Sequence, residues 1–359
     1  MNEKIRGIDG LKGITAVIIA YVYHYCILFE TNPFHSYKVL ELVFDSLNLY
    51  IGYAEGIFFL ISGFMMSYIY EEKIKELSLL DFLKTRVKKI YPMMIVSVVI
   101  VFLLENLGKN ILGYYPLYGE RGDVQYSLSA LLSSILGIQT GYFSDGDTYS
   151  VNGPTWFISI LFLCYLISFS IMKIGKDNKI RMLCIMGMFF IGVIISFSHG
   201  FDFPLLYSCN GRGYTEFFLG ILMAKFINRE KKIPTFSGVF LLILAFVLCA
   251  FTKTYLSEER IILTELFLYP VVFYLVLKTN WMASFLHIKI LRYLGRISMP
   301  IYIFNFPVLV GIVLMNDYFQ MYLDYSKPLV WVFIVEVSIL IAMGIGGIQK
   351  KIKEKRYVH

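Results

Sequence analysis

The chain has 359 residues, of which 57% are hydrophobic, 17% aromatic and only 16% charged. Soluble domains carry about 25% charged residues, so this composition excludes a water-soluble globular protein and indicates a polytopic membrane protein. The net charge of +7 is not gathered in a basic patch on a soluble domain, so we expect no nucleic-acid partner.

Ten apolar runs are candidate membrane spans, because crossing about 30 Å of hydrocarbon takes about 20 residues of helix. They predict an all-α fold, with a single transmembrane domain over residues 1–359. The ten runs are 10–29, 50–70, 89–107, 155–173, 180–198, 213–228, 235–252, 260–278, 292–314 and 329–349.

Lysine and arginine are distributed unequally between the two sides of these spans. If the N-terminus lies inside, most of the 33 basic residues fall in inner loops or at the termini. The outer loops then hold Lys38, Lys109, Arg121, Arg212, Lys253, Arg260 and Lys327. By the positive-inside rule, we expect a multi-pass protein of the cell membrane, surrounded by membrane lipids, with both termini in the cytoplasm.

His24 lies near the outer end of the first span, in the stretch IAYVYHYCILF. An ionisable group inside a span is rare and usually faces the bundle interior or a water-filled cavity. A histidine that bonds a neighbouring helix, or one lifted to the interface beside its two tyrosines, explains the position equally well. Because the imidazole also suits general-base chemistry near neutral pH, both interpretations stay open.

Charged residues open the same helix at its inner end. Arg6 is 18 residues from His24, which is five full turns, so these two side chains share a face. Asp9 and Lys12 follow, and Lys12 lies about 120° away from that face. By themselves, Arg6 and Lys12 are typical of the basic residues that flank a span on its inner side.

The next two patterns are FFLISGF in the second span and RVKKIYP at the inner end of the third. Ser62 and Gly63 of the first pattern are typical of close helix packing in membranes. In the second, Arg86 and Lys89 are three residues apart and share a helix face. Paired cations there suit a diphosphate group, or anionic lipid headgroups with no further function.

A long outer loop, residues 108–153, separates the third and fourth spans and is rich in Gly, Tyr, Ser and Asp. Within it, residues 128–138 are too short to span and predict an interfacial or re-entrant segment. Long ordered loops tend to carry function, so we expect this loop to cover a site or to bind an acceptor.

Polar residues recur in the later spans. Trp156 opens the fourth span, where a position in the interfacial aromatic belt is the default interpretation. Arg212, in an outer loop, is expected to pair with Glu216 of the sixth span, and Asn305 lies in the ninth span between two prolines. The carboxylates that fall within spans, where they are costly, are Glu55, Glu216, Glu265 and Glu336.

The five cysteines are scattered without the spacing of metal ligands. We therefore expect no disulfide framework and no metal site, and interpret these residues as small apolar packing groups. They are Cys26, Cys164, Cys184, Cys209 and Cys249, of which Cys209 is expected in an outer loop.

Taken in order, these patterns resemble membrane-bound acyltransferase family 3, the ten-helix O-acyltransferases that modify cell-surface polysaccharides, lipopolysaccharide and peptidoglycan. The similarity rests on IDGLKGITAVIIAYVYH at the start, FFLISGF, RVKKIYP, WFI from Trp156 and LGRISMPIYIFNFPV near the end. It covers essentially the whole chain, with the motifs in family order.

The resemblance implies transfer of an acyl group, expected to be acetyl, from cytoplasmic acyl-CoA to a hydroxyl of an extracytoplasmic glycan or glycolipid. It assigns general-base catalysis to His24 and places the opening arginine of the family at Lys12. The resulting candidates are catalytic His24, Asp9 and Lys12; donor-binding Arg86, Lys89 and Arg6; and substrate-binding Ser62, Trp156, Asn305 and Arg212.

Three departures from the family pattern bear on these assignments. The opening residue is Lys12, which lacks the guanidinium fork, and one residue more than usual separates it from His24. Either Arg6 has taken over its role or a local bulge restores the helical register. Asn305 stands where a histidine is usual, and Ile160 stands where many members carry a glutamate.

Two other functions are compatible with the sequence. A transporter or flippase of a lipid-linked sugar would also combine ten spans, intramembrane carboxylates and proline-broken helices. An acyltransferase-like domain that has lost catalysis would serve as a sensor or scaffold. The sequence also leaves a homodimer open.

Overall fold

The computed structural model describes residues 7–51, 53–117, 119, 122–144, 150–175, 177–227, 231–255 and 260–355. Within these ranges the elements are helical and no strand is present, apart from one isolated β-bridge between Tyr115 and Gly119. The all-α prediction is therefore confirmed.

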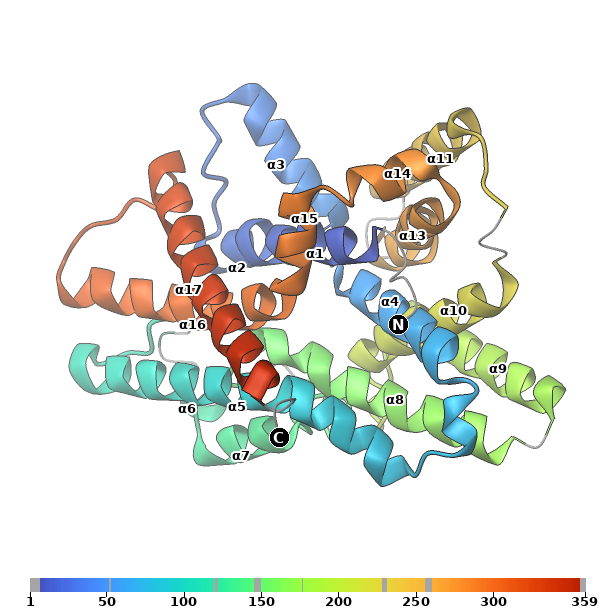
Figure 1. Cartoon of the computed structure of the whole chain (residues 1–359). Helices are drawn as coiled ribbons and strands as arrows, with labels where there is room; N and C mark the ends of the chain where they lie inside the picture. Colours follow the sequence, from blue (N-terminus) through green and yellow to red (C-terminus); the bar gives the residue numbers. More distant parts are fainter. Residues whose placement is uncertain are drawn as a thin grey trace.

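Figure 1 shows how the helices are arranged along the chain. The first half contains α1 (Ile8–Ile18), the π-helix η1 (Ile19–Tyr23), α2 (His24–Phe29), α3 (Lys38–Ile51), α4 (Glu55–Tyr70), η2 (Lys73–Lys75), α5 (Leu79–Leu112), α6 (Gly122–Gln125), α7 (Leu128–Leu136), η3 (Gly153–Thr155) and α8 (Trp156–Ile174). The second half contains α9 (Asn178–Phe197), α10 (Ser208–Phe226), α11 (Thr235–Tyr255), α12 (Arg260–Leu263), the π-helix η4 (Thr264–Leu268), α13 (Tyr269–Lys278), α14 (Asn280–Phe285), α15 (Lys289–Arg296), α16 (Ser298–Tyr318) and α17 (Pro328–Lys355).

Among the described residues, seven helices are long and apolar enough to cross a membrane, and α3 with α4 makes an eighth span if this bent pair is counted as one. The seven correspond to the first, third, fourth, fifth, eighth, ninth and tenth predicted runs. The second run falls on this pair, in which the chain bends by 46° between α3 and α4. The chain is thus a multi-pass membrane protein, while the count of ten spans stays a prediction.

The sixth and seventh predicted runs differ from the others. They fall on α10 and α11, and the apolar part of α11 is the shorter stretch Thr235–Ala250. Helix α10 carries polar side chains that are fully or almost fully buried, among them Asn210, Thr215 and Glu216. Since lipid would not solvate these groups, α10 is a central helix enclosed by the rest of the bundle.

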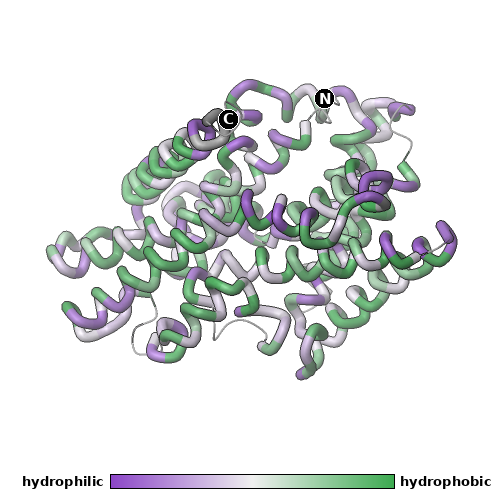
Figure 2. The backbone as a smooth tube through the Cα atoms, turned by 60° about the horizontal axis from the view of Figure 1, so that its bottom comes forward, coloured by the Kyte–Doolittle hydropathy of each residue, from purple (hydrophilic) through white to green (hydrophobic). Residues whose placement is uncertain are grey.

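Outer helices expose large apolar side chains. Leu183 on α9 is 71% exposed, Phe236 on α11 is 82% exposed and Leu340 on α17 is 65% exposed. Figure 2 shows long hydrophobic stretches along the helices, with hydrophilic residues at several helix ends. Soluble monomers rarely expose so much apolar surface, so these faces suit contact with lipid.

Helices α4 and α10 pack with their backbones in contact. A Cβ atom added at Gly63 would lie 1.8 Å from the carbonyl oxygen of Phe217, and one at Gly220 would lie 2.1 Å from that of Leu60. Glycine is therefore required at both positions for this approach. The glycine of FFLISGF serves helix packing, and Ser62 beside it is partly exposed on α4.

The N-terminal end of the first span packs in a similar way against the end of α14 and against α15. A Cβ atom at Gly10 would lie 1.9 Å from the carbonyl oxygen of Leu286, and one at Gly295 would lie 1.8 Å from that of Asp9. The opening motif and the late LGR motif are thus joined through glycine backbones.

The predicted outer loop, residues 108–153, contains helical segments. Helix α7 covers Leu128–Leu136, where the sequence predicts a segment too short to span. The end of the loop enters the bundle, because the fully buried Asn152 donates from Nδ2 to Ser97 Oγ at 2.9 Å and to the carbonyl of Ile303 at 3.1 Å. These bonds hold the start of α8 against α5 and α16.

Candidate functional site

His24 follows a break within the first span. Five residues of π-helix come after α1, and the backbone amide of His24 donates to the carbonyl of Ile19 in an i→i−5 bond. Because a π-turn holds about one residue more than an α-turn, the break accommodates the extra residue between Lys12 and His24. A local bulge is therefore present at this point, while Arg6 lies outside the described residues.

Side chains from two later helices bind carbonyl groups of this π-helix. Nδ2 of Asn305 on α16 donates to the carbonyl oxygen of Ala20 at 3.2 Å. Nε1 of Trp331 on α17 donates to the carbonyl oxygen of Tyr21 at 2.7 Å. These two hydrogen bonds stabilise the π-helix. Because π-helical turns are rare and often mark functional sites, the break is a candidate functional feature.

Asn305 also contacts His24 directly. Its Nδ2 lies 2.9 Å from Nδ1 of His24, and the two residues are 1% and 7% exposed. The Ala20 carbonyl requires a donor opposite it, which places the amide nitrogen rather than the oxygen at this point. Nδ1 of a neutral His24 then accepts, its ring proton is on Nε2, and the buried Oδ1 of Asn305 has no hydrogen-bond partner.

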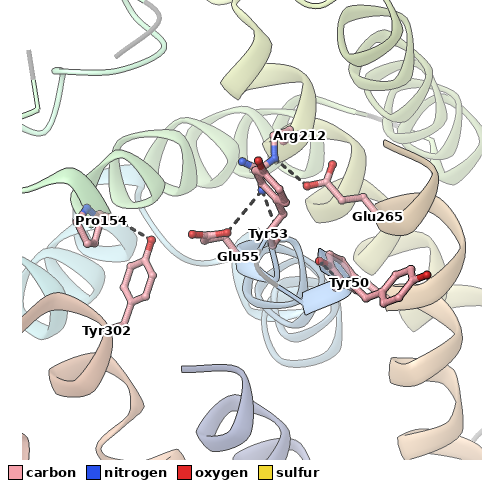
Figure 3. A network of polar contacts seen from close by, with 8 residues as sticks. Tyr50, Tyr53, Glu55, Pro154, Arg212, Glu265 and Tyr302 are labelled. Atoms are coloured by element: carbon pink, nitrogen blue, oxygen red, sulfur yellow. Dashed lines mark hydrogen bonds and ion pairs between the residues drawn. The ribbon is translucent and has the colours of Figure 1, made fainter. Parts of the chain in front are cut away.

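Aromatic rings surround the imidazole of His24. Its ring centroid lies 5.7 Å from that of Tyr23, 6.1 Å from that of Tyr302 and 6.2 Å from that of Phe306. The hydroxyl of Tyr302 donates to the carbonyl of Pro154 at 2.9 Å (Figure 3). The imidazole therefore lies in a mostly apolar environment that is joined to the NGPTW motif before α8.

A second polar centre is built around Arg212, on α10. Its Nε donates to Oε1 of Glu265 at 2.7 Å, and its Nη2 donates to the carbonyl of Tyr53 at 3.1 Å (Figure 3). The same Nη2 lies 3.6 Å from Oε2 of Glu55. Both carboxylates are almost fully buried, and Glu55 in the first turn of α4 also faces the positive end of that helix.

Two aromatic rings lie against the Arg212 guanidinium. Its Cζ atom is 5.0 Å from the ring centroid of Trp156 and 5.2 Å from that of Tyr53. Such cation–π contacts are strongest where water is excluded. The structure thus brings together two of the predicted substrate-binding residues, Arg212 and Trp156, on α10 and α8.

Two expectations about this region are wrong. Arg212 lies inside α10 and not in an outer loop, and its carboxylate partners are Glu55 and Glu265 instead of Glu216. Both oxygens of the fully buried Glu216 have no hydrogen-bond partner. The acidic residues in apolar runs did signal a buried charged centre, but their partner could not be chosen because pairing depends on how the helices pack.

The predicted donor-binding residue Arg86 lies on α5 within an aromatic cage. Its Cζ atom is 4.6 Å from the ring centroid of Tyr70, 4.8 Å from that of Tyr165 and 5.3 Å from that of Phe82. These rings fix the guanidinium in place while Lys89, three residues later, is exposed. The arrangement suits recognition of a charged group at this end of α5.

Asp9 and Lys12 do not form one cluster with His24. Lys12 Nζ lies 3.5 Å from Asp9 Oδ1 at the opposite end of the first span. His24 lies twelve positions after Lys12, a rise of about 18 Å along the helix axis. A ligand that touches both ends would have to be long and extended.

In the described part of the chain, no group of three or more His, Cys, Asp or Glu side chains is placed to hold a metal ion. All five cysteines are free. Cys209, expected in an outer loop, is buried in α10.

Known proteins resemble this chain over large parts of its length. An O-acetyl transferase of Shigella phage Sf6 is 24% identical over 235 residues, which are 62% of this chain and 63% of the phage protein. An uncharacterized protein of Haemophilus influenzae is 25% identical over 189 residues, 49% of this chain and 76% of that protein. No solved structure is significantly similar to the chain. A family model described as an acyltransferase domain matches residues 5–347, and the chain therefore belongs to acyltransferase family 3.

Proposed function

We propose that this protein is a membrane O-acyltransferase that moves an acyl group, most simply acetyl, from cytoplasmic acyl-CoA to a hydroxyl of a glycan or glycolipid outside the membrane. The observation that carries the proposal is the buried imidazole of His24, held by Asn305 inside a helical bundle of the acyltransferase family. The relationship to a phage O-acetyl transferase supports the reaction class.

His24 is proposed as the general base. The acceptor oxygen attacks the thioester carbon while the imidazole takes the hydroxyl proton. The C–S bond then breaks, an ester forms, and the CoA thiolate leaves and recovers the proton from the imidazolium. A His inside an apolar site is suited to this role because its charge is needed only while the reaction proceeds.

Asn305 is proposed as the residue that positions the imidazole. In the resting arrangement it donates to Nδ1, which leaves Nε2 protonated and unable to act as a base. If the amide turns over and the ring proton moves from Nε2 to Nδ1, the unpartnered Oδ1 accepts from Nδ1–H and the lone pair of Nε2 becomes free for the acceptor, while the Ala20 carbonyl gives up its bond from Asn305. An amide can make either contact, which explains how asparagine serves where a histidine is usual.

The donor is proposed to bind from the cytoplasmic side. Arg86 and Lys89 would neutralise the CoA phosphates at one inner helix end, and Lys12 or Arg6 at another. The rise of about 18 Å between Lys12 and His24 suits the extended shape of CoA, whose phosphates and thioester lie at opposite ends. Arg212 and Trp156 are proposed to line the acceptor side, and Ser62 stays a candidate without a contact that assigns its role.

The test uses the purified protein in detergent with acetyl-CoA and no acceptor, so that water replaces the acceptor hydroxyl. We expect slow hydrolysis by the wild type, normal binding but at least about 100-fold slower hydrolysis by His24→Asn, and weak binding by Arg86→Ala. The matched control is His199→Asn, because His199 is exposed at a positive φ of 55° that asparagine tolerates.

Full hydrolysis by His24→Asn would contradict the role of the imidazole. If the wild type neither bound nor hydrolysed any acyl-CoA, the donor assignment would be wrong. The alternative predicted by the sequence, a transporter or flippase, would then be tested by substrate movement without CoA.

A further inference from the structure

A cavity of about 500 Å³ opens beside the first span, between its outer part and α3. The residues that line it are Tyr23, Cys26, Ile27, Asp45, Asn48, Leu49 and Tyr53. They come from η1, α2, α3 and the bend before α4. None of them belongs to the predicted acceptor loop 108–153, so the cavity is a separate feature.

The lining groups have the chemistry of a sugar-binding site. The rings of Tyr23 and Tyr53 lie 5.0 Å apart at an angle of 53° and form an aromatic wall. Asp45 and Asn48 supply a carboxylate and an amide, which can accept from and donate to hydroxyl groups. Asp45 is the charged side chain among the lining residues, so a neutral, hydroxyl-rich ring is favoured over an anionic one.

The position of the carboxylate is set by the loop between α2 and α3. Nδ2 of Asn32 donates to Oδ1 of Asp45 at 2.8 Å and to the carbonyl of Glu41 at 3.3 Å. One carboxylate oxygen is thereby oriented by the protein, and the other can accept from a ligand. A binding group held in this way needs little ordering when a ligand arrives.

Two of the lining residues, Tyr23 and Tyr53, contact the two polar centres of the bundle. Tyr23 directly precedes His24, and their ring centroids are 5.7 Å apart. Tyr53 stacks on the Arg212 guanidinium at 5.2 Å and accepts from it through its carbonyl oxygen. A ring bound in the cavity would therefore be separated from His24 by one aromatic side chain.

We propose that this cavity binds the sugar ring of the acceptor and presents one of its hydroxyls to His24. The inference rests on the proposed acyltransferase function and names the site of its second substrate. Because His24 does not line the cavity and is only 7% exposed, Tyr23 must turn aside before transfer. The cavity would thus load the acceptor, and Tyr23 would separate the loaded acceptor from the base.

The experiment measures the two half-reactions separately on the full chain. Transfer is measured as base-released acetate from the surface polysaccharide of cells that express each variant, and donor chemistry as acetyl-CoA hydrolysis in detergent. Asn48→Leu should lower transfer by about tenfold or more through the loss of hydrogen bonds to the acceptor, with hydrolysis retained. The matched control is Leu42→Ala, since Leu42 lies on the same helix, is 67% exposed and does not line the cavity.

Chemical modification of Cys26 provides a second test. It is made on the wild-type protein, so it does not depend on a variant that could fail to fold. Because Cys26 lines the cavity, a membrane-impermeant maleimide applied to whole cells should block transfer, and Cys26→Ser should make transfer insensitive. Transfer that persists at the wild-type level in Asn48→Leu and after modification of Cys26 would overturn the cavity assignment. By contrast, a wild type that shows neither hydrolysis nor transfer would overturn the proposed function itself.

Discussion

The side-chain amide of Asn305 lies 2.9 Å from Nδ1 of His24, although 281 positions separate the two residues in the chain. The same amide nitrogen binds the carbonyl of Ala20 within the π-helix. One residue of the late motif thus contacts both the candidate base and the backbone break that orients it. The opening motif and the late motif of the family pattern are therefore in direct contact at His24.

Replacement of Asn305 should impair chemistry more than donor binding. Asn305→Leu removes both hydrogen bonds, and we expect kcat for acetyl-CoA hydrolysis to fall about tenfold, which corresponds to about 1.4 kcal/mol in the barrier. KM for acetyl-CoA should stay within about twofold, because the donor phosphates bind elsewhere. Steady-state kinetics on the purified protein measures both quantities.

A structural role alone would give a different pattern. Asn305→His supplies a ring nitrogen at the same position and should recover part of the rate lost in Asn305→Leu. If both variants lost activity in proportion to their loss of folded protein, Asn305 would be a packing residue and its positioning role would be wrong.

Removal of the Arg212 guanidinium should destabilise the bundle. Arg212→Leu leaves Glu55 and Glu265 buried without their cation, and we expect a loss of about 3–5 kcal/mol in the free energy of unfolding. Arg212→Lys should recover little, because an ammonium cannot bridge both carboxylates and stack on two rings. The midpoint of thermal unfolding in detergent measures the effect.

Neutralising the two buried carboxylates, Glu55 and Glu265, provides the control for this prediction. Arg212→Leu combined with Glu55→Gln and Glu265→Gln should unfold at a higher temperature than Arg212→Leu alone. An unchanged midpoint in the single variant would show that the carboxylates are already satisfied without Arg212.

The glycine contact between α4 and α10 should tolerate no side chain. Gly63→Ala places a methyl group where the carbonyl oxygen of Phe217 lies within 1.8 Å, and we expect a loss of about 1–3 kcal/mol or more in stability. Gly187→Ala on α9 is the matched control, because a Cβ there meets no atom within 4 Å. It should be neutral or stabilising, since alanine favours helix by about 1 kcal/mol over glycine. Equal unfolding midpoints for the two variants would show that α4 and α10 are farther apart.

The π-helix before His24 should depend on the indole of Trp331. Trp331→Phe keeps an aromatic ring but removes the donor to the Tyr21 carbonyl, so we expect a loss of about 1 kcal/mol and slower acyl-CoA hydrolysis. Trp281→Phe is the control, because Nε1 of Trp281 has no hydrogen-bond partner. A larger effect at Trp281 than at Trp331 would contradict the prediction.

The sequence by itself determined the membrane class and most of the spans. Apolar runs and basic flanks are local signals, since the bilayer thickness sets the length of a span wherever it occurs. The same local signals singled out His24 as a candidate site residue, and the motif FFLISGF with its packing glycine. They missed α3, whose apolar residues are interrupted by Glu41 and Asp45, and with it the cavity that α3 lines.

Only the tertiary structure decided which of these residues meet. The pairing of Asn305 with His24, and of Arg212 with Glu55 and Glu265, joins helices that are distant in sequence. Helices in a membrane have no hydrophobic reason to choose one neighbour over another, so close glycine contacts and buried polar bonds select the arrangement. These contacts depend on the packing of the whole bundle, which no single segment specifies.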